Sequence, residues 1–205
     1  MRERAALAGD LGCVSDWGGA GSAEDPEYRP FPDVERRNAW QERVELPLMV
    51  AALGLPAAGR VLEVGCGRGV ALPVLARLLR PRRLVGVDAD RSLLELARKR
   101  CGVPAGVVEV RRADVRALPY PDASFDLVVD FGTCYHVARR HQALREIARV
   151  LADGGLFAYE TRLSQVLSHP LRSLGRGLPW PAAPELAPRR NAGLWALRER
   201  RARSR

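Results

Sequence analysis

Short, continuous apolar segments alternate with longer segments of helical periodicity through the middle of the chain. The apolar segments are 61–64, 84–87, 107–110, 126–129 and 156–159. Strands buried on both faces have continuous apolar sequences, whereas strands with one exposed face alternate between apolar and polar residues. Three helical segments lie between them. The first ends at Leu79, the second spans about 92–100, and the third spans about 139–151. The pattern predicts an α/β fold, a doubly wound Rossmann-like parallel sheet with helices on both faces.

The 205 residues suffice for one ordinary domain, so we expect a single core. Gly and Pro residues mark 1–32 as an irregular N-terminal segment. Residues 33–160 form the core and begin with two short helices that meet near Pro47. Gly154 and Gly155 are expected to form the turn before the last core strand. Residues 161–205 form a basic segment rich in Pro and Arg.

The net charge of +9 is uneven along the chain. Residues 1–160 contribute 23 basic and 22 acidic groups, a balance of +1, and 161–205 contribute ten against two, a balance of +8. A basic tail can bind nucleic acid or an anionic membrane surface. A solubilising, loosely structured end is the favoured alternative, so we consider a nucleic-acid partner unfavoured.

Two further features bear on location and on metal binding. The apolar stretches are shorter than the roughly 20 residues that a bilayer crossing needs, and we find no secretory signal, so we expect a cytoplasmic protein without a membrane span. The four cysteines contain no Cys-x-x-Cys pair, which disfavours a zinc site or a disulfide framework. We expect reduced thiols and no metal. The cysteines are Cys13, Cys66, Cys101 and Cys134.

A glycine-rich loop, Val-Gly-Cys-Gly-Arg-Gly over 64–69, follows the first predicted strand. Ligands of open parallel sheets bind at the carboxyl ends of the strands, where this loop must approach them closely. Asp88 ends the second predicted strand, and a carboxylate there can accept hydrogen bonds from ribose hydroxyls. Val70 replaces the third glycine of the dinucleotide fingerprint. Glu63 suits a cofactor with an ammonium and a sulfonium better than one with phosphates.

Four motifs in order, VLEVGCGRG, GVDAD, ADVRALPYPDASFDLVV and EIARVLADGG, span about residues 60–160. In these motifs the sequence resembles the class I S-adenosylmethionine-dependent methyltransferases, in particular the small-molecule branch related to ubiquinone and menaquinone biosynthesis. The resemblance implies S-adenosylmethionine as cofactor. It also implies in-line transfer of the methyl group to an O, N, S or C nucleophile of a small-molecule acceptor.

The resemblance also implies roles for residues that bind the methionine and ribose portions of the cofactor. Gly65, Cys66 and Gly67 would lie under the methionine portion. Glu63 would steer the amino group, and Asp88 would hold the ribose. A structural role for Glu63 and a capping role for Asp88 are the alternatives.

Further residues would contact the adenine and the reacting group. Ala89 would pack on the adenine, Asp114 would accept from its amino group, and the amide of Val115 would pair with the ring. A turn cap is the alternative role for Asp114. Phe131 and Gly132 would pass near the methionine carboxylate and the reacting methyl group.

Tyr135 and His136 follow the fourth predicted strand and are the candidates for a general base, with a structural role as the alternative for His136. We interpret Asp126 as a turn residue and leave Asp130 undecided. The segment 28–44, with Tyr28, Phe31 and Trp40, is a candidate lid over the acceptor pocket, and core packing is the alternative for Trp40.

The family usually adds a strand hairpin after residue 160. Only 192–197 reads as a late strand here, and we expect 198–205 to be frayed. We therefore expect the sheet to close with a shortened or irregular edge. Two other functions remain as alternatives: an NAD(P)-linked oxidoreductase, which Val70 disfavours, and a non-catalytic nucleic-acid-binding module that uses the Arg-rich tail.

Overall fold

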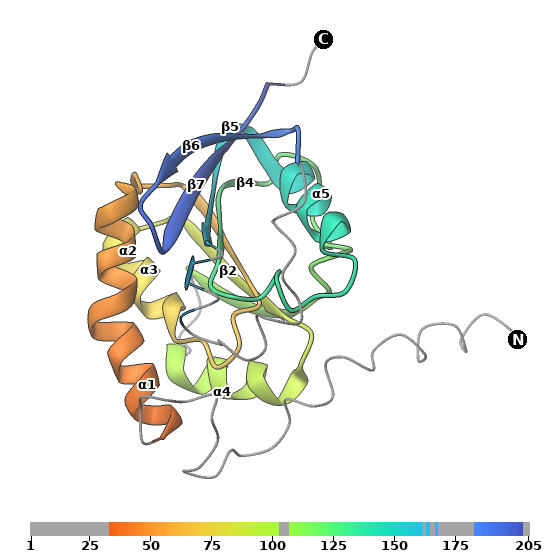
Figure 1. Ribbon diagram of the computed structural model, residues 1–205. Helices are drawn as coiled ribbons and strands as arrows, with labels where there is room; N and C mark the ends of the chain where they lie inside the picture. Colours follow the sequence, from red (N-terminus) through yellow and green to blue (C-terminus); the bar gives the residue numbers. More distant parts are fainter. Residues whose placement is uncertain (1–32, 103–106, 162, 165–166, 168–182, 203–205) are drawn as a thin grey trace, which may run out of the picture.

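The computed structural model describes residues 33–102, 107–161, 163–164, 167 and 183–202, and within them seven strands form one sheet (Figure 1). Its order is β3-β2-β1-β4-β5-β7-β6. The first five strands run parallel, and β7 runs antiparallel to both of its neighbours. The strands are β1 (Arg60–Val64), β2 (Arg83–Asp88), β3 (Val108–Arg112), β4 (Phe125–Asp130), β5 (Leu151–Glu160), β6 (Leu186–Asn191) and β7 (Trp195–Arg200).

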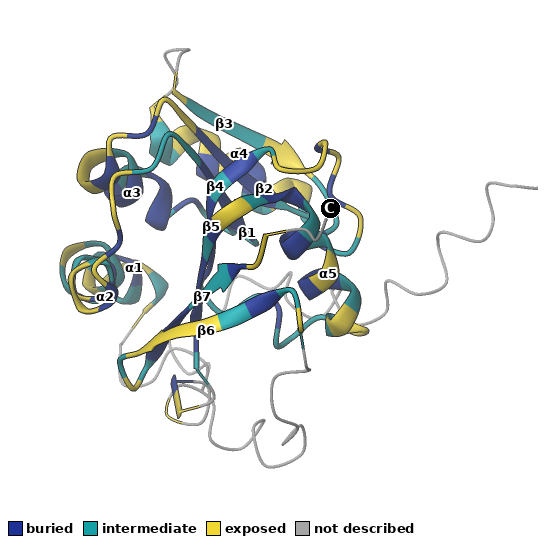
Figure 2. Cartoon of the chain, turned by 90° about the horizontal axis from the view of Figure 1, so that it is seen from above, coloured by how far each residue is buried: buried dark blue, intermediate teal, exposed yellow. Residues whose placement is uncertain are grey.

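Helices cover both faces of the sheet, which confirms the doubly wound arrangement (Figure 2). Buried residues of α2, α3 and α4 pack on one face, and those of α5 pack on the other. The helical elements are α1 (Val34–Trp40), the π-helical turn η3 (Gln41–Glu45), α2 (Leu46–Leu53), α3 (Ala71–Leu79), α4 (Arg91–Cys101) and α5 (Arg140–Val150).

The alternation of side chains along β1 explains the continuous apolar sequence. Val61 belongs to the core beneath α2 and α3, whereas Leu62 belongs to the core beneath α5. Neither side chain is exposed to solvent. A strand with an apolar layer on each side has no position at which a polar side chain could reach water, so the pattern of period two is absent.

The N-terminal helical segment differs from the prediction of two helices that meet near Pro47. It runs without a break from Val34 to Leu53, and η3 ends at Glu45, two residues before Pro47. Proline lacks an N–H and its ring crowds the preceding turn. A wider π turn accommodates such a residue inside a helix.

The C-terminal hairpin is more complete than we predicted. Both β6 and β7 have six residues, and the irregularity is confined to a register shift between Pro188 and Arg190. Residues 198–200, predicted to be frayed, are paired in β7. The proline obscured β6 in the sequence, but an edge strand tolerates a residue without an N–H.

The prediction that Gly154 and Gly155 form a turn before the strand was wrong. Strand β5 already begins at Leu151, and both glycines lie inside it. The pairing with β4 jumps from Leu151 to Leu156, so the glycines form an irregular bulge. Gly154 has φ of 76°, a conformation that glycine adopts without strain.

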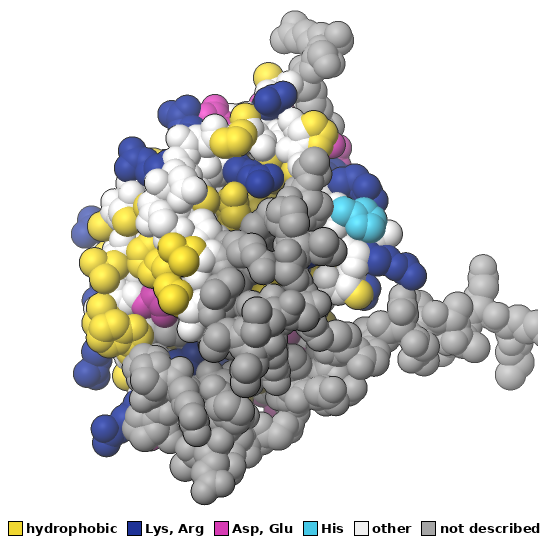
Figure 3. All heavy atoms as spheres, in the orientation of Figure 1, with side chains coloured by type: hydrophobic (Ala, Val, Ile, Leu, Met, Phe, Trp, Pro, Cys, Tyr) yellow, Lys and Arg dark blue, Asp and Glu magenta, His cyan; other side chains and the backbone are white. Residues whose placement is uncertain are grey.

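Two surface features complete the description. Among the described residues, no helix has both the length and the apolar character needed to cross a bilayer. Hydrophobic side chains gather over α1 and α2 in Figure 3, where Trp40 is 48% exposed and Leu48 is 54% exposed.

Candidate functional site

The glycine-rich loop turns sharply between β1 and α3. Gly65, Gly67 and Gly69 all have positive φ, of 67°, 50° and 74°. A Cβ on Gly65 would lie 1.8 Å from Oγ1 of Thr133, so this glycine is required by packing. A Cβ on Gly67 would meet no atom of the described residues within 4 Å. Among those residues the space beside Gly67 is therefore open, as a cradle for a ligand requires.

Asp88 ties the end of β2 to this loop. Its Oδ2 accepts a hydrogen bond of 2.8 Å from the amide of Gly67, and its Oδ1 accepts one of 2.9 Å from the amide of Asp90. The turn role that we considered for Asp88 is thus present. Each carboxylate oxygen has a second lone pair, so the group can still accept from two ribose hydroxyls. Burial raises the pKa of Asp88.

Glu63 lies near the carboxyl end of β1 and is only 3% exposed. Its Oε2 has no hydrogen-bond partner in the described part of the chain. Burial raises the pKa of Glu63 well above its ordinary value, and repulsion from Asp88 and Asp130 adds to the effect. An unpartnered buried carboxylate is costly unless a ligand supplies the missing positive charge or hydrogen bond.

Asp130, which the sequence left undecided, ends β4 beside the end of β1. Its Oδ1 accepts a hydrogen bond of 2.7 Å from the amide of Thr133, and Oδ2 accepts one of 3.2 Å from the amide of Cys134. Burial raises the pKa of Asp130 to about 6. Three acidic side chains thus converge at neighbouring strand ends.

Glu160 is a fourth acid that the sequence analysis missed. It ends β5 and is 8% exposed. Burial raises its pKa to about 8, with further repulsion from Glu45 and Asp130, while Arg37 and a hydrogen bond with Ser164 lower it. The sequence contains the information needed to find it, because Glu160 directly follows the predicted strand 156–159, just as Asp88 ends the second predicted strand.

The four acids define what the site can bind. Carboxylates that are removed from water and lie near one another repel, and a cation relieves both costs. The open space at Gly67 and the unpartnered oxygen of Glu63 fit a ligand that carries positive charge. S-adenosylmethionine carries an ammonium and a sulfonium, so the residues present fit this cofactor.

The residues predicted to contact adenine follow β3. The amide of Ala113 donates to the carbonyl of Asp88, which brings Asp114 toward the ribose side of the site. Asp114 accepts from the amide and guanidinium of Arg116, at 2.8 and 2.7 Å, so the turn role considered for it is also present. Burial alone would raise the pKa of Asp114, but the contacts with Arg116 hold this pKa below its usual value.

The other two adenine candidates have different surroundings. Val115 is buried in the core beneath α5. The carbonyl of Ala89 accepts a hydrogen bond of 3.0 Å from Nε of Arg112. The carbonyl contact fixes the backbone directly after β2, while the role of either residue toward adenine stays a prediction.

The turn after β4 brings Tyr135 and His136 to the carboxyl end of the sheet. Their ring centroids lie 4.0 Å apart, and the amide of His136 donates to the carbonyl of Thr133. A Cβ on Gly132 would lie 3.0 Å from the hydroxyl of Tyr135 and 3.1 Å from Oε2 of Glu160. Gly132, Tyr135 and Glu160 therefore share one corner of the site.

Cys66 and Phe131 support the site through packing. Both side chains join the core beneath α2 and α3. Burial raises the pKa of the Cys66 thiol, which keeps the side chain in its neutral form within this core. Cys66, Cys101 and Cys134 are free, whereas Cys13 lies outside the described residues.

The predicted lid is described only from residue 33 onward, so Tyr28 and Phe31 lie outside the described residues. Helix α1 and η3 are held to α4 by ion pairs of Arg100 with Glu35 and Glu42, at 3.2 and 3.5 Å. Glu45 repels the carboxylate of Glu160 and raises its pKa, whereas Arg37 attracts the carboxylate and lowers its pKa. This helical segment therefore borders the corner that Glu160 occupies.

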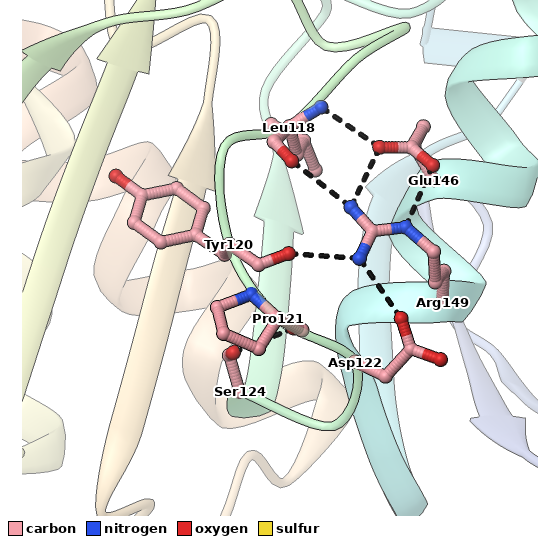
Figure 4. A network of polar contacts seen from close by, with 7 residues as sticks. All are labelled: Leu118, Tyr120, Pro121, Asp122, Ser124, Glu146 and Arg149. Atoms are coloured by element: carbon pink, nitrogen blue, oxygen red, sulfur yellow. Dashed lines mark hydrogen bonds and ion pairs between the residues drawn. The ribbon is translucent and has the colours of Figure 1, made fainter.

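A charged network fixes the loop between Asp114 and β4 (Figure 4). Arg149 of α5 donates to the carbonyls of Leu118 and Tyr120, at 2.9 and 2.8 Å. It also contacts Asp122 and Glu146, at 3.0 and 2.8 Å. The amide of Leu118 donates to Glu146. One side chain thus anchors the loop on the helix.

Comparisons with known proteins agree with this geometry. Residues 62–159 match the family described as a methyltransferase domain. The fatty-acid O-methyltransferase of Mycolicibacterium smegmatis is 35% identical over 140 residues, which are 68% of this chain and 50% of that protein. The phthiotriol/phenolphthiotriol dimycocerosates methyltransferase of Mycobacterium tuberculosis is 39% identical over 102 residues, which are 49% of this chain and 36% of that protein.

Among solved structures, the PH0226 protein of Pyrococcus horikoshii OT3 is similar with a TM-score of 0.55 and 27% identity. The match covers 71% of this chain and 70% of that one. The chain spans about half the length of the curated relatives it matches. The branch related to ubiquinone and menaquinone biosynthesis stays a prediction. From the matched motifs, the sheet order and the acids at the strand ends, we conclude that the chain belongs to the class I S-adenosylmethionine-dependent methyltransferases.

Proposed function

We propose that this protein binds S-adenosylmethionine at the carboxyl ends of β1, β2, β4 and β5 and transfers its methyl group to a small-molecule acceptor. The observation that carries the proposal is the buried Oε2 of Glu63, which has no hydrogen-bond partner in the described part of the chain and lies near the carboxylates of Asp88 and Asp130. A cationic cofactor supplies the charge that these groups lack.

Each residue of the site has a proposed task. The loop from Gly65 to Gly67 lies against the methionine portion, and Glu63 holds its ammonium group. Asp88 holds the ribose through the lone pairs that its backbone contacts leave free. At the far end, Asp114 and the Val115 amide hold the adenine, for which Ala89 forms one wall.

When bound, the cofactor supplies a methyl group that is already reactive because it is attached to a sulfonium. The protein then has to align the acceptor and exclude water, which by proximity alone lowers the barrier by several kcal/mol. Phe131 and Gly132 border the reacting group. His136, beside Tyr135, takes the proton of a hydroxyl or phenol acceptor where one must be removed.

The acceptor nucleophile is O, N, S or C, and similarity to a fatty-acid O-methyltransferase favours oxygen. The family match does not favour the NAD(P)-linked oxidoreductase. Nor does it favour the nucleic-acid-binding module, and the Lys and Arg side chains on the face in Figure 3 are scattered rather than gathered. The cytoplasmic location stays a prediction.

Calorimetry with S-adenosylmethionine, S-adenosylhomocysteine and NAD tests the proposal. We expect saturable binding of the first two and none of NAD. Glu63→Gln should weaken S-adenosylmethionine binding while the matched exposed variant Glu95→Gln leaves it unchanged. Saturable NAD binding without S-adenosylmethionine binding would overturn the proposed function.

A further inference from the structure

Glu160 is one of the acids at the strand ends, but the function proposed above assigns no part of the cofactor to it. It ends β5, and its Oε2 lies 3.1 Å from the position that a Cβ on Gly132 would take. The carboxylate thus points toward the backbone that follows β4. The hydroxyl of Tyr135 reaches the same position from the other side, at 3.0 Å.

The charged groups around Glu160 come from several elements. Glu45 of η3 and Asp130 of β4 repel its negative charge, and Arg37 of α1 attracts it. Ser164 forms a hydrogen bond with it. In this nearly buried corner the guanidinium of Arg37 is thus, among the described residues that act on Glu160, the one positive charge against three carboxylates, which belong to Glu45, Asp130 and Glu160. A negative charge on Glu160 is unfavourable there until another positive charge arrives.

S-adenosylmethionine brings two positive charges, and Glu63 is assigned to the ammonium. The sulfonium is the second, and it disappears during the reaction. The S–CH3 bond breaks, its electron pair stays on sulfur as a neutral thioether, and the methyl group forms a bond to the acceptor atom. A carboxylate beside Gly132 therefore interacts with a charge that only the substrate form of the cofactor carries.

We propose that Glu160 determines the preference of the site for the sulfonium form of the cofactor over its thioether product. This inference rests on the proposed function. In the free protein and in the thioether complex Glu160 holds a proton, and the sulfonium displaces it. The loss of the cation after transfer weakens the attraction and favours release of the product.

The preference must then depend on pH. A ligand that binds only the ionised form of a group gains affinity as pH rises toward the pKa of that group, up to about tenfold per pH unit. Burial raises the pKa of Glu160 to about 8. The dissociation constant of S-adenosylhomocysteine divided by that of S-adenosylmethionine should therefore rise between pH 6 and 8 and level off above pH 8.

Titration calorimetry with S-adenosylmethionine and S-adenosylhomocysteine, from pH 6 to 8.5, measures this ratio. At pH 7, titrations in phosphate and in Tris buffer give the protons released, because the buffers differ in their enthalpy of ionisation. We expect S-adenosylmethionine binding to release about one proton more than S-adenosylhomocysteine binding. In Glu160→Gln the ratio should be lower and independent of pH, whereas the exposed acid variant Glu95→Gln should match the wild type.

The outcomes separate the two proposals. If S-adenosylmethionine does not bind the wild type, the proposed function fails and this inference fails with it. If it binds but the wild-type ratio is flat with pH, only the inference is overturned, even if Glu160→Gln does not fold. An unchanged proton release in a folded Glu160→Gln variant would likewise overturn the inference, because the proton would belong to another group.

Discussion

The amide of Gly67 donates a hydrogen bond of 2.8 Å to Oδ2 of Asp88 and so joins the loop after β1 to the end of β2. The proposed ribose-binding carboxylate is thus positioned by the same loop that borders the methionine portion. A change at either residue should be felt by both parts of the cofactor.

Asp88→Asn should weaken S-adenosylmethionine binding by about 1–3 kcal/mol, the usual loss for a hydrogen bond to a charged group. Calorimetry gives the affinity, and the thermal midpoint shows that the protein remains folded. The exposed Asp153 in the bulge of β5 provides the matched control, Asp153→Asn, which should bind as the wild type does. Equal affinities for both variants would contradict the proposed pose.

Gly67 and Gly102 form a matched pair for a test of the open space. Their φ angles are 50° and 54°, and a Cβ on either would meet no atom within 4 Å in the part of the chain that the structure describes. Substitution of either glycine by alanine should therefore lower the unfolding free energy by about 1 kcal/mol, because a residue with a Cβ is strained in the left-handed conformation. Gly67→Ala alone should lose cofactor affinity, at least about tenfold, because its methyl group enters the ligand space. Calorimetry and denaturant unfolding separate the effects, and similar affinities would argue against a ligand at Gly67.

The free protein should become less stable as pH rises from about 6 to 8. Glu160 has its pKa raised to about 8 from an ordinary 4.5, so below pH 8 the folded form holds a proton that the unfolded form has lost. Stability falls with pH wherever the folded state binds more protons. Urea unfolding across this range should show the decline, and Glu160→Gln should make it shallower, with the raised pKa of Glu63 accounting for part of what remains. A steeper decline in the variant would contradict the assignment.

Arg149→Met should loosen the loop that leads to β4. The substitution removes the contacts of the guanidinium with Leu118, Tyr120 and Asp122 and leaves their oxygens without this donor. We expect a loss of about 2 kcal/mol in unfolding free energy, as for other partly buried hydrogen-bond networks. The exposed Arg145 on the same helix gives the control, Arg145→Met, for which a loss of similar size would exclude a specific role for the network.

His136→Ala separates a proton-transfer role from a structural one. If His136 takes the acceptor proton, turnover should fall about 10²–10⁴-fold with little change in S-adenosylmethionine affinity. Transfer of a labelled methyl group to hydroxyl and phenol acceptors gives the rate, because a carboxylate acceptor is already ionised and needs no base. Calorimetry gives the affinity. Near-normal turnover, or loss of the fold, would instead leave catalysis to alignment alone.

The central sheet was predictable because its strands are continuous apolar segments and because its loops carry fixed glycine and acidic positions. Asp88 could be placed at a strand end from its spacing alone. The bulge at Gly154 and the strand that contains Pro188 were not predictable, since a glycine pair reads as a turn and a proline reads as a break. In both, pairing with a neighbouring strand outweighs the local preference.

Glu160 shows a different limit. A strand end can be located in the sequence, but the burial of its last side chain depends on elements far away in the chain. Arg37 and Glu45 precede it by more than 100 residues and come close to it only in the fold. Spacing therefore predicts which acids reach the edge of the sheet, and tertiary contacts decide which of them lose access to water.

The antiparallel pairing of Glu160 with Trp195 has a consequence for synthesis on the ribosome. Until residues 195–200 emerge, β5 has an open hydrogen-bonding edge, and unpaired edges recruit other chains. The segment that seals this edge begins at Trp195, 35 residues after Glu160, so it is translated later than the strand that it covers. A nascent chain paused between these two residues therefore exposes an unpaired edge at the strand that ends in the site, and β7 covers that edge when it pairs with β5.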